Sequence, residues 1–158
     1  MEKRVFMIIY QKLLYHQNSM NTWSIIRRWT WELPQTLIGA AIALLHKEKP
    51  LRVIEYADQR VYLYDNFNGG ISLGYYTHLD WNAKDHNNNV VREGLKKSVR
   101  HEALGHGTQS KWLGWLYLPI IGLPSVIHCA IHKLCGRRWD YYSFPTEKWA
   151  DKIAKIER

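Results

Sequence analysis

The sequence predicts an α+β domain in which helices precede and follow a small antiparallel sheet. Apolar residues recur at helical spacing before residue 47 and after residue 90, and they alternate at strand spacing between residues 51 and 79. The chain has 158 residues, of which 46% are apolar and 23% charged, as expected for one compact globular domain over 1–158. This order of helices, sheet and helices favours the α+β class.

Residues 1–46 are predicted to form the helical N-terminal part. The region 5–31 is rich in aromatic side chains and is interrupted near 17–22 by a polar cluster typical of a turn. Pro34 suits the first turn of a second helix that continues to about His46. The early apolar run is too short for the core of a signal peptide, and no small-residue cleavage site follows it, so we expect no export.

The small sheet is predicted for 51–79, with three strands bounded by turn residues. Asp58–Gln59 would form the first turn and Asn66–Gly70 the second, where two glycines give the backbone latitude for a tight return. The strands themselves are expected at 51–57, 60–65 and 71–79.

Helical spacing returns after a polar loop at 82–89. A helix predicted for 90–109 carries the most informative motif of the chain. The apolar segment 112–135 contains prolines and glycines that would break a simple membrane-spanning helix, so we expect a buried or interfacial hairpin. A last helix is expected over 146–156.

Two histidines flank a glutamate in the motif His101-Glu102-Ala103-Leu104-Gly105-His106. The arrangement is similar to the zinc-peptidase signature H-E-x-x-H, in which two histidines bind the metal and the glutamate acts on a water. A third ligand must then come from elsewhere in the chain. Downstream, the predicted last helix contains Glu147 and Asp151 in the pattern E-x-x-A-D.

Together these motifs resemble the gluzincin metallopeptidases, and specifically the membrane-embedded group related to the CAAX-prenyl endopeptidase. The resemblance implies a zincin-like fold, a Zn²⁺ cofactor and a peptide or protein substrate. It also implies His101, His106 and Glu147 as zinc ligands. Glu102 would be the general base, and Asp151 would orient a ligand from outside the ligand set.

Most of the chain also resembles an uncharacterised bacterial family that is common in gut Bacteroidetes. Members of that family carry a H-E-x-G-H helix and a C-terminal E-x-x-A-D, and this resemblance implies fold more than function. The matching segments of this chain are Trp31–Gln35, Gly70–Gly74, the motif helix into Ser110, Leu113–Leu118, Gly122–Ser125 and Tyr141–Asp151.

The histidines of this chain are five residues apart, whereas the signature has four. On a regular helix, His101 would lie about 140° from His106 and would point away from the apolar face. A π-bulge would absorb the extra residue and return both histidines to one site. Otherwise Glu102 would face inward with His106 and Glu147, and the usual base would be missing. The first alternative predicts a zinc metallopeptidase, and the second a non-catalytic, membrane-associated binding or scaffold protein with a degenerate site.

Two further segments are candidates for binding. In the peptidase interpretation, Ile71, Ser72, Leu73 and Gly74 would form the edge strand that pairs with the substrate backbone. His128 and His132 have helical i, i+4 spacing, with Cys135 three residues further on, which suits a second metal site. Two histidines on such a helix are more often structural.

Charge and composition bear on the partners. The net charge is +8, and basic pairs lie near tryptophans, as at Arg27-Arg28 and Arg137-Arg138. Such clusters suit an anionic membrane surface, and the sequence contains no specific nucleic-acid-binding motif. A basic, aromatic-rich adaptor without catalysis is a further hypothesis. Two cysteines exclude a disulfide framework, so we expect a cytoplasmic protein or one associated with the cytoplasmic membrane.

Overall fold

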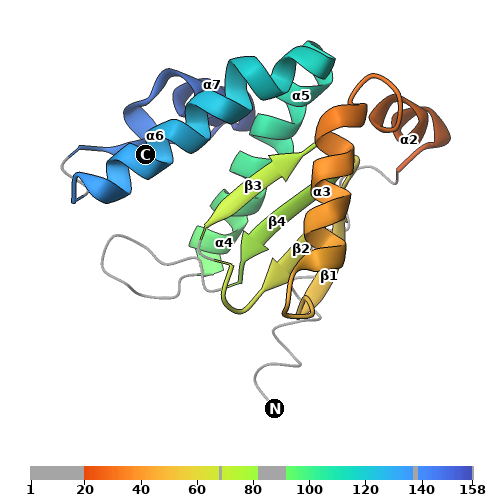
Figure 1. Cartoon of the computed structure of the whole chain (residues 1–158), viewed down its shortest axis with the longest axis horizontal. Helices are drawn as coiled ribbons and strands as arrows, with labels where there is room; N and C mark the ends of the chain where they lie inside the picture. Colours follow the sequence, from red (N-terminus) through yellow and green to blue (C-terminus); the bar gives the residue numbers. More distant parts are fainter. Residues whose placement is uncertain (1–19, 68, 82–91, 137–138, 158) are drawn as a thin grey trace.

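A computed structural model describes residues 20–67, 69–81, 92–136 and 139–157 as an α+β fold built on a four-stranded mixed sheet. One helix covers one face of the sheet, and a long interrupted helix covers the other (Figure 1). The elements, in chain order, are α2 (Thr22–Arg28), α3 (Leu33–Leu45), β1 (Arg52–Tyr56), β2 (Gln59–Tyr64), β3 (Gly70–Leu73), β4 (Tyr76–Asp80), α4 (Arg92–Val99), η1 (Arg100–His106), α5 (Gly107–Leu113), η2 (Gly114–Leu116), η3 (Leu118–Gly122), α6 (Leu123–Leu134), η4 (Tyr141–Ser143) and α7 (Pro145–Ala154).

The sheet differs from the prediction in its pairing. Its strand order is β1-β2-β4-β3, and β2 pairs with β4 in parallel, so the expectation of an antiparallel sheet was wrong for this pair. The β1–β2 and β3–β4 pairs are antiparallel. Apolar alternation marks each strand but carries no information about which strand lies beside it.

The single strand predicted at 71–79 is two strands, β3 and β4, joined by a tight turn. Gly74 has a φ of +60°, a conformation that breaks the strand and favours glycine. A Cβ at this position would lie 2.1 Å from the Thr36 hydroxyl oxygen, so α3 approaches the turn closely. Gly74 therefore lies outside the strand in which the sequence placed it.

The main core lies between the sheet and the α4–η1 helix. Val61, Leu63 and Leu79 project from the sheet and are buried against Leu95 and Val99. The helical spacing of Leu95 and Val99 predicted this helix. Because η1 continues directly from α4, the motif lies next to the core. The opposite face of the sheet packs on α3, where Gly39 allows contact with β3 and β4.

A buried polar network fixes α2 and α3 to the rest of the fold. Arg28 and Glu32 form an ion pair at 2.7 Å, and neither side chain is exposed to solvent by more than 1%. The Ser110 hydroxyl of α5 donates to Glu32, and Arg28 donates to the Gly74 carbonyl. Burying an ion pair costs less when hydrogen bonds satisfy its remaining polar atoms, as these partners do in part.

The helical half of the chain follows the predicted ranges with shifted ends. The motif helix extends to Leu113, and the last helix ends at Ala154. The apolar segment turns at η2, so that Gly94–Leu116 and Leu118–Leu134 are bent by 120°. Within the described ranges, no single helix has the length and apolarity to cross a membrane, and only this bent pair passes the two criteria together. The loop predicted at 82–89 and the part of the predicted N-terminal helical region before residue 20 lie outside the described residues.

Candidate metal centre

The extra residue of the motif is absorbed by a π-helix. η1 covers Arg100–His106, and the Gly107 N–H donates to the Glu102 carbonyl, which is the i→i+5 hydrogen bond of a π-turn. The wider turn brings residues that are five apart onto one face of the helix. Of the two alternatives posed by the sequence, the structure contains the π-bulge, and both histidines face the same site.

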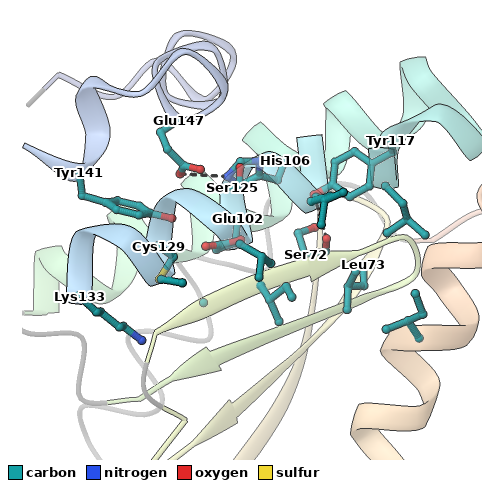
Figure 2. A pocket seen from close by; sticks show the side chains of 18 residues that line it. Ser72, Leu73, Glu102, His106, Tyr117, Ser125, Cys129, Lys133, Tyr141 and Glu147 are labelled. Atoms are coloured by element: carbon teal, nitrogen blue, oxygen red, sulfur yellow. Dashed lines mark hydrogen bonds and ion pairs between the residues drawn. The ribbon is translucent and has the colours of Figure 1, made fainter. Parts of the chain in front are cut away.

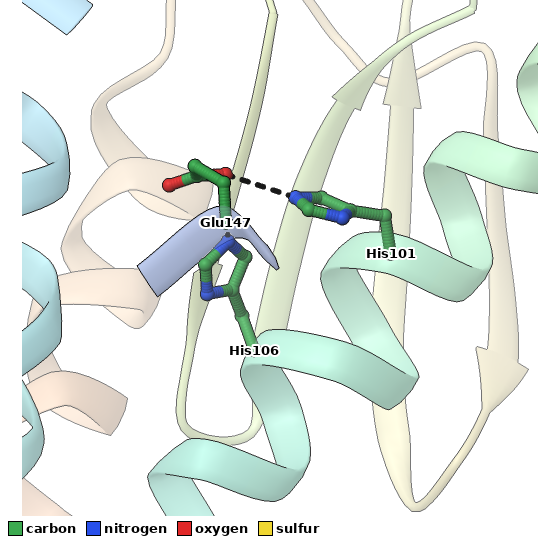
Figure 3. Close-up of side chains that lie close together, drawn as sticks. All are labelled: His101, His106 and Glu147. Carbon is green, nitrogen blue, oxygen red and sulfur yellow. Dashed lines mark hydrogen bonds and ion pairs between the residues drawn. The ribbon is translucent and has the colours of Figure 1, made fainter. Parts of the chain in front are cut away.

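Three buried side chains converge at this site. His101 and His106 come from η1 and Glu147 from the first turn of α7, and one ligand atom from each lies within 4.8 Å of the others. His101 Nε2 is 3.0 Å from Glu147 Oε2, and His106 Nε2 is 3.3 Å from the same oxygen (Figure 3). The two histidine nitrogens and one carboxylate oxygen that the resemblance implied as ligands therefore meet.

A second layer of hydrogen bonds orients both imidazoles. His101 Nδ1 lies 2.7 Å from Asp151 Oδ1, and His106 Nδ1 lies 2.7 Å from Gln109 Oε1. The Gln109 amide is itself fixed, because its Nε2 donates to the Thr146 carbonyl at 3.0 Å. Each ring therefore directs Nε2 toward the centre, as outer hydrogen bonds do for histidine ligands of metals.

Asp151 was predicted from the E-x-x-A-D pattern, whereas Gln109 was not predicted. The available signal was its position three residues after His106, which places both side chains on one helix face. Tyr141 was also missed as a site residue, because nothing in its local sequence connects it to the motif helix.

The electrostatics favour a charged centre. Burial alone lowers the pKa of His101, but hydrogen bonds to Asp151 and Glu147 outweigh it and raise that pKa to about 9. Burial alone raises the pKa of Glu147, and hydrogen bonds from His101 and His106 hold it well below its ordinary value. In the metal-free protein, a protonated His101 therefore neutralises an ionised Glu147, and a cation that binds here takes over that role.

The centre opens onto a cavity of about 680 Å³ that is also lined by Glu102. Figure 2 shows Glu102 and Glu147 on two sides of this space, with Tyr141 extending into it. Burial raises the pKa of Tyr141, and the nearby Glu147 and Glu102 raise it further, so its hydroxyl stays protonated. A Cβ at Gly70 would lie 2.6 Å from Glu102 Oε1, so the Glu102 carboxylate lies against the start of β3.

The predicted substrate strand forms one wall of the cavity. β3 is the edge strand of the sheet, and Gly70, Ile71, Ser72 and Leu73 line the cavity. The Asp80 N–H donates to the Gly69 carbonyl, so by alternation the backbone of Ile71 faces β4 and that of Gly70 and Ser72 faces outward. The Ser72 carbonyl accepts a hydrogen bond from Tyr117 on this outer side.

Gly74, the last residue of the predicted substrate strand, is placed elsewhere. Its carbonyl accepts hydrogen bonds from Arg28 and from Gln59, at 2.9 Å and 2.6 Å. Because it turns the chain into β4 and is tied to these buried side chains, its assignment to the substrate strand was wrong.

Close packing of η1 on α7 assembles the centre. A Cβ at Gly105 would lie 2.6 Å from the Ala150 carbonyl oxygen, so only glycine allows the two helices to approach this closely. Arg100, at the start of η1, donates to the Ala154 carbonyl at the end of α7. A cation at a helix C-terminus is favourable, and this contact sets the alignment of the two helices.

The second metal site suggested by the sequence does not assemble in the described part of the chain. His128 Nε2 lies 3.2 Å from the Tyr141 carbonyl, and His132 Nε2 lies 2.9 Å from the Trp139 carbonyl. Among the described residues, the only group with metal-binding spacing is that of His101, His106 and Glu147. His128 and His132 instead attach α6 to the segment that carries Tyr141, and Cys135 is exposed.

Comparisons with protein-family models, with curated proteins and with solved structures find no match to this chain. The function proposed for this chain therefore rests on the geometry of the site.

Proposed function

We propose that this protein is a zincin-like metallopeptidase that hydrolyses peptide bonds with the help of a zinc ion held by His101, His106 and Glu147. The observation that carries the proposal is the convergence of three ligand atoms beside a cavity that also contains Glu102. A set of two histidines and one glutamate is a known catalytic zinc set, and it leaves one coordination position for water or substrate.

The donor set fits zinc in detail. Both histidines present Nε2, and their Nδ1 atoms are held by Asp151 and Gln109. Imidazole nitrogen and carboxylate oxygen are ligands that zinc accepts readily. Zinc in such a site supplies a Lewis acid that polarises a carbonyl and lowers the pKa of water.

The surrounding residues supply the remaining functions. Glu102 would accept a proton from the attacking water and return it to the leaving amine, so that the peptide bond breaks without net proton change. The protonated Tyr141 hydroxyl is placed in the same cavity and would donate to the oxygen on which negative charge develops. An extended peptide would add to the outer edge of β3 at Gly70, beside the Ser72 carbonyl that already accepts from Tyr117.

The alternative of a non-catalytic protein with a degenerate site depended on a regular helix that turns His101 away. The π-helix removes that reason, because it directs His101 toward Glu147. Catalysis is therefore the better-supported proposal.

Metal content tests the proposal. The protein is purified without a histidine tag, as the wild type and as His101→Ala, His106→Ala, Glu147→Ala and Glu102→Gln. We expect about one zinc per chain in the wild type and in Glu102→Gln, and loss of zinc in the other three variants. On a peptide library, Glu102→Gln should lose on the order of 10²–10⁴ in rate, the usual contribution of a general base. A wild type that binds no metal would refute the proposal.

A further inference from the structure

The apolar face of α6 is exposed, and three of its residues, Leu123, Val126 and Ala130, also line the cavity. Taking Leu123 as the origin, successive residues are rotated by about 100°, so the apolar side chains fall in a stripe about 140° wide. This α6 stripe consists of Leu123, Val126, Ile127, Ala130, Ile131 and Leu134. The helix has no buried residue, and the exposed fraction of the large side chains in the stripe ranges from 46% to 86%.

The polar side of α6 faces the protein instead. Ser125 hydrogen-bonds to Thr146 at 2.8 Å, and His128 and His132 contact the backbone carbonyls of Tyr141 and Trp139. A surface helix normally buries its apolar stripe and exposes its polar side. In α6 the polar side contacts the protein and the apolar stripe is exposed. Because a contiguous exposed apolar surface marks an interaction site, we expect an apolar environment to cover the stripe.

Charge and aromatic residues identify this environment. Lys133 borders the stripe, Arg137-Arg138 follow α6 in the sequence, and the net charge of the chain is +8. Before the helix, Trp112 and Trp115 are 58% and 61% exposed. Tryptophan is enriched at membrane–water interfaces, and clustered lysine and arginine are attracted to anionic lipids.

We propose that the protein docks on an anionic lipid surface, with the α6 stripe lying in the plane of the interface. Figure 1 shows α6 at the periphery of the molecule, alongside α7. Its polar anchors to 139–146 stay on the protein side while the stripe enters the region between headgroups and acyl chains. Docking of this kind needs no metal, so it stands independently of the proposed peptidase activity.

Vesicle co-sedimentation tests this proposal. The wild type should bind vesicles of phosphatidylcholine with phosphatidylglycerol, and should bind more weakly to phosphatidylcholine alone or at high salt. The double variant Ile127→Ser/Ile131→Ser changes two side chains of the stripe that do not line the cavity. Its affinity for vesicles should be at least about tenfold lower than that of the wild type, because two apolar side chains are lost from the interface. The matched control is Leu51→Ser/Val53→Ser, in which both residues are apolar, exposed and near β1, and it should bind as the wild type does.

Two outcomes would overturn the proposal. Equal vesicle binding by the two double variants would show that α6 is not the docking face. The second outcome is that the wild type does not bind vesicles but forms a dimer, and that only the Ile127→Ser/Ile131→Ser variant is monomeric. This result would show that the stripe contacts a second copy of the chain. Zinc content and circular dichroism of each variant confirm that the fold is intact, and a chain that docks without binding zinc would refute the peptidase proposal alone.

Discussion

Each histidine of the candidate centre has a hydrogen-bond partner on the nitrogen that faces away from Glu147. Asp151 is the partner of His101, and Gln109 is the partner of His106. The carboxylate is the stronger partner, because hydrogen bonds with an ionised member are about twice as strong as neutral ones. The orientation of His101 therefore depends on a residue that does not reach the centre itself.

Asp151→Ala should weaken zinc binding by about 10- to 100-fold, the usual cost of losing an outer partner of a histidine ligand. The reason is that His101 loses the acceptor at 2.7 Å that fixes its ring. Competition with a chromophoric chelator measures the affinity. Glu55→Ala removes an exposed carboxylate on β1 and should leave the affinity unchanged. Equal affinities for Asp151→Ala and the wild type would contradict the assigned role.

His78 makes the stability of the fold sensitive to acid. Its side chain is fully buried on β4, where Nε2 lies 3.0 Å from the Gly39 carbonyl and Nδ1 lies 3.2 Å from the Tyr64 hydroxyl. Burial lowers the pKa of His78 to about 4, and the neighbouring His46 lowers it as well, while the bond to Gly39 opposes the shift. The ring is therefore neutral in the folded protein at pH values where it is charged in the unfolded chain.

Between pH 6.5 and about 4, the unfolded state binds more protons at this residue than the folded state does. The contribution of His78 to the free energy of unfolding should accordingly fall by up to about 1.4 kcal/mol per pH unit as the pH is lowered through this window. Urea unfolding of the wild type and His78→Gln at several pH values measures it. The variant should show the shallower dependence, and parallel curves would contradict the prediction.

Sequence reasoning identified the proposed ligands but not the whole lining of the site. His101, His106, Glu147 and Asp151 belong to motifs with a fixed spacing, so a resemblance could identify them. The cavity depends on tertiary packing, which brings Tyr141 and β3 beside the motif helix from positions far apart in the chain. No local pattern contains that information.

η1 shows how two histidines that are five residues apart can still face one site. Helical phase alone revealed the conflict, because residues five apart cannot share a face of an α-helix. It could not decide the outcome, because the hydrogen-bond pattern of the helix depends on its packing against α7. Gly105, at the closest approach to Ala150, is the local feature that allows this packing.

Deletion of Leu104 should leave zinc binding intact. The deletion places the histidines four residues apart, and a regular α-helix then presents both on one face. The free energy of unfolding should decrease, because Leu104 packs against the main core. Insertion of one alanine after Leu104 is the opposite change and should abolish zinc binding. Loss of zinc in the deletion variant would show that the π-turn supplies a geometry that an α-helix cannot replace.

The sheet illustrates a different limit of prediction. Alternating apolar residues located the strands, but a glycine with positive φ ended β3 within the predicted strand. The order β1-β2-β4-β3 places a late strand between two earlier ones. Strand order is set by long-range packing, so the parallel β2–β4 pair could not be predicted from alternation.

The α+β class was predictable for the molecule as a whole, because it follows from where helical and strand periodicity occur along the chain. The orientation of α6 was not predictable in the same way. Its amphipathic pattern indicates two faces, yet only the contacts of His128 and His132 show that the polar face is the inner one.

Zinc should stabilise the entire domain, since its proposed ligands join η1 to α7. Free zinc at a thousandfold excess over Kd adds about 4 kcal/mol to the free energy of unfolding. For a chain of this size, that corresponds to a rise in Tm of roughly 10 °C. Differential scanning calorimetry with and without zinc measures the shift. Glu147→Ala should show little shift, and an equal shift in the variant would place the metal elsewhere.

Glu147 follows His106 by 41 residues, a separation that has a consequence during synthesis. The growing chain exposes η1 before α7 has left the ribosome, so a nascent chain that already contains both histidines lacks the proposed third ligand, Glu147. The candidate metal centre can form only after α7 packs against η1 at Gly105. In the proposed peptidase, hydrolytic activity would therefore begin only after α7 has been synthesised and has packed against η1. An incomplete chain would have no peptidase activity.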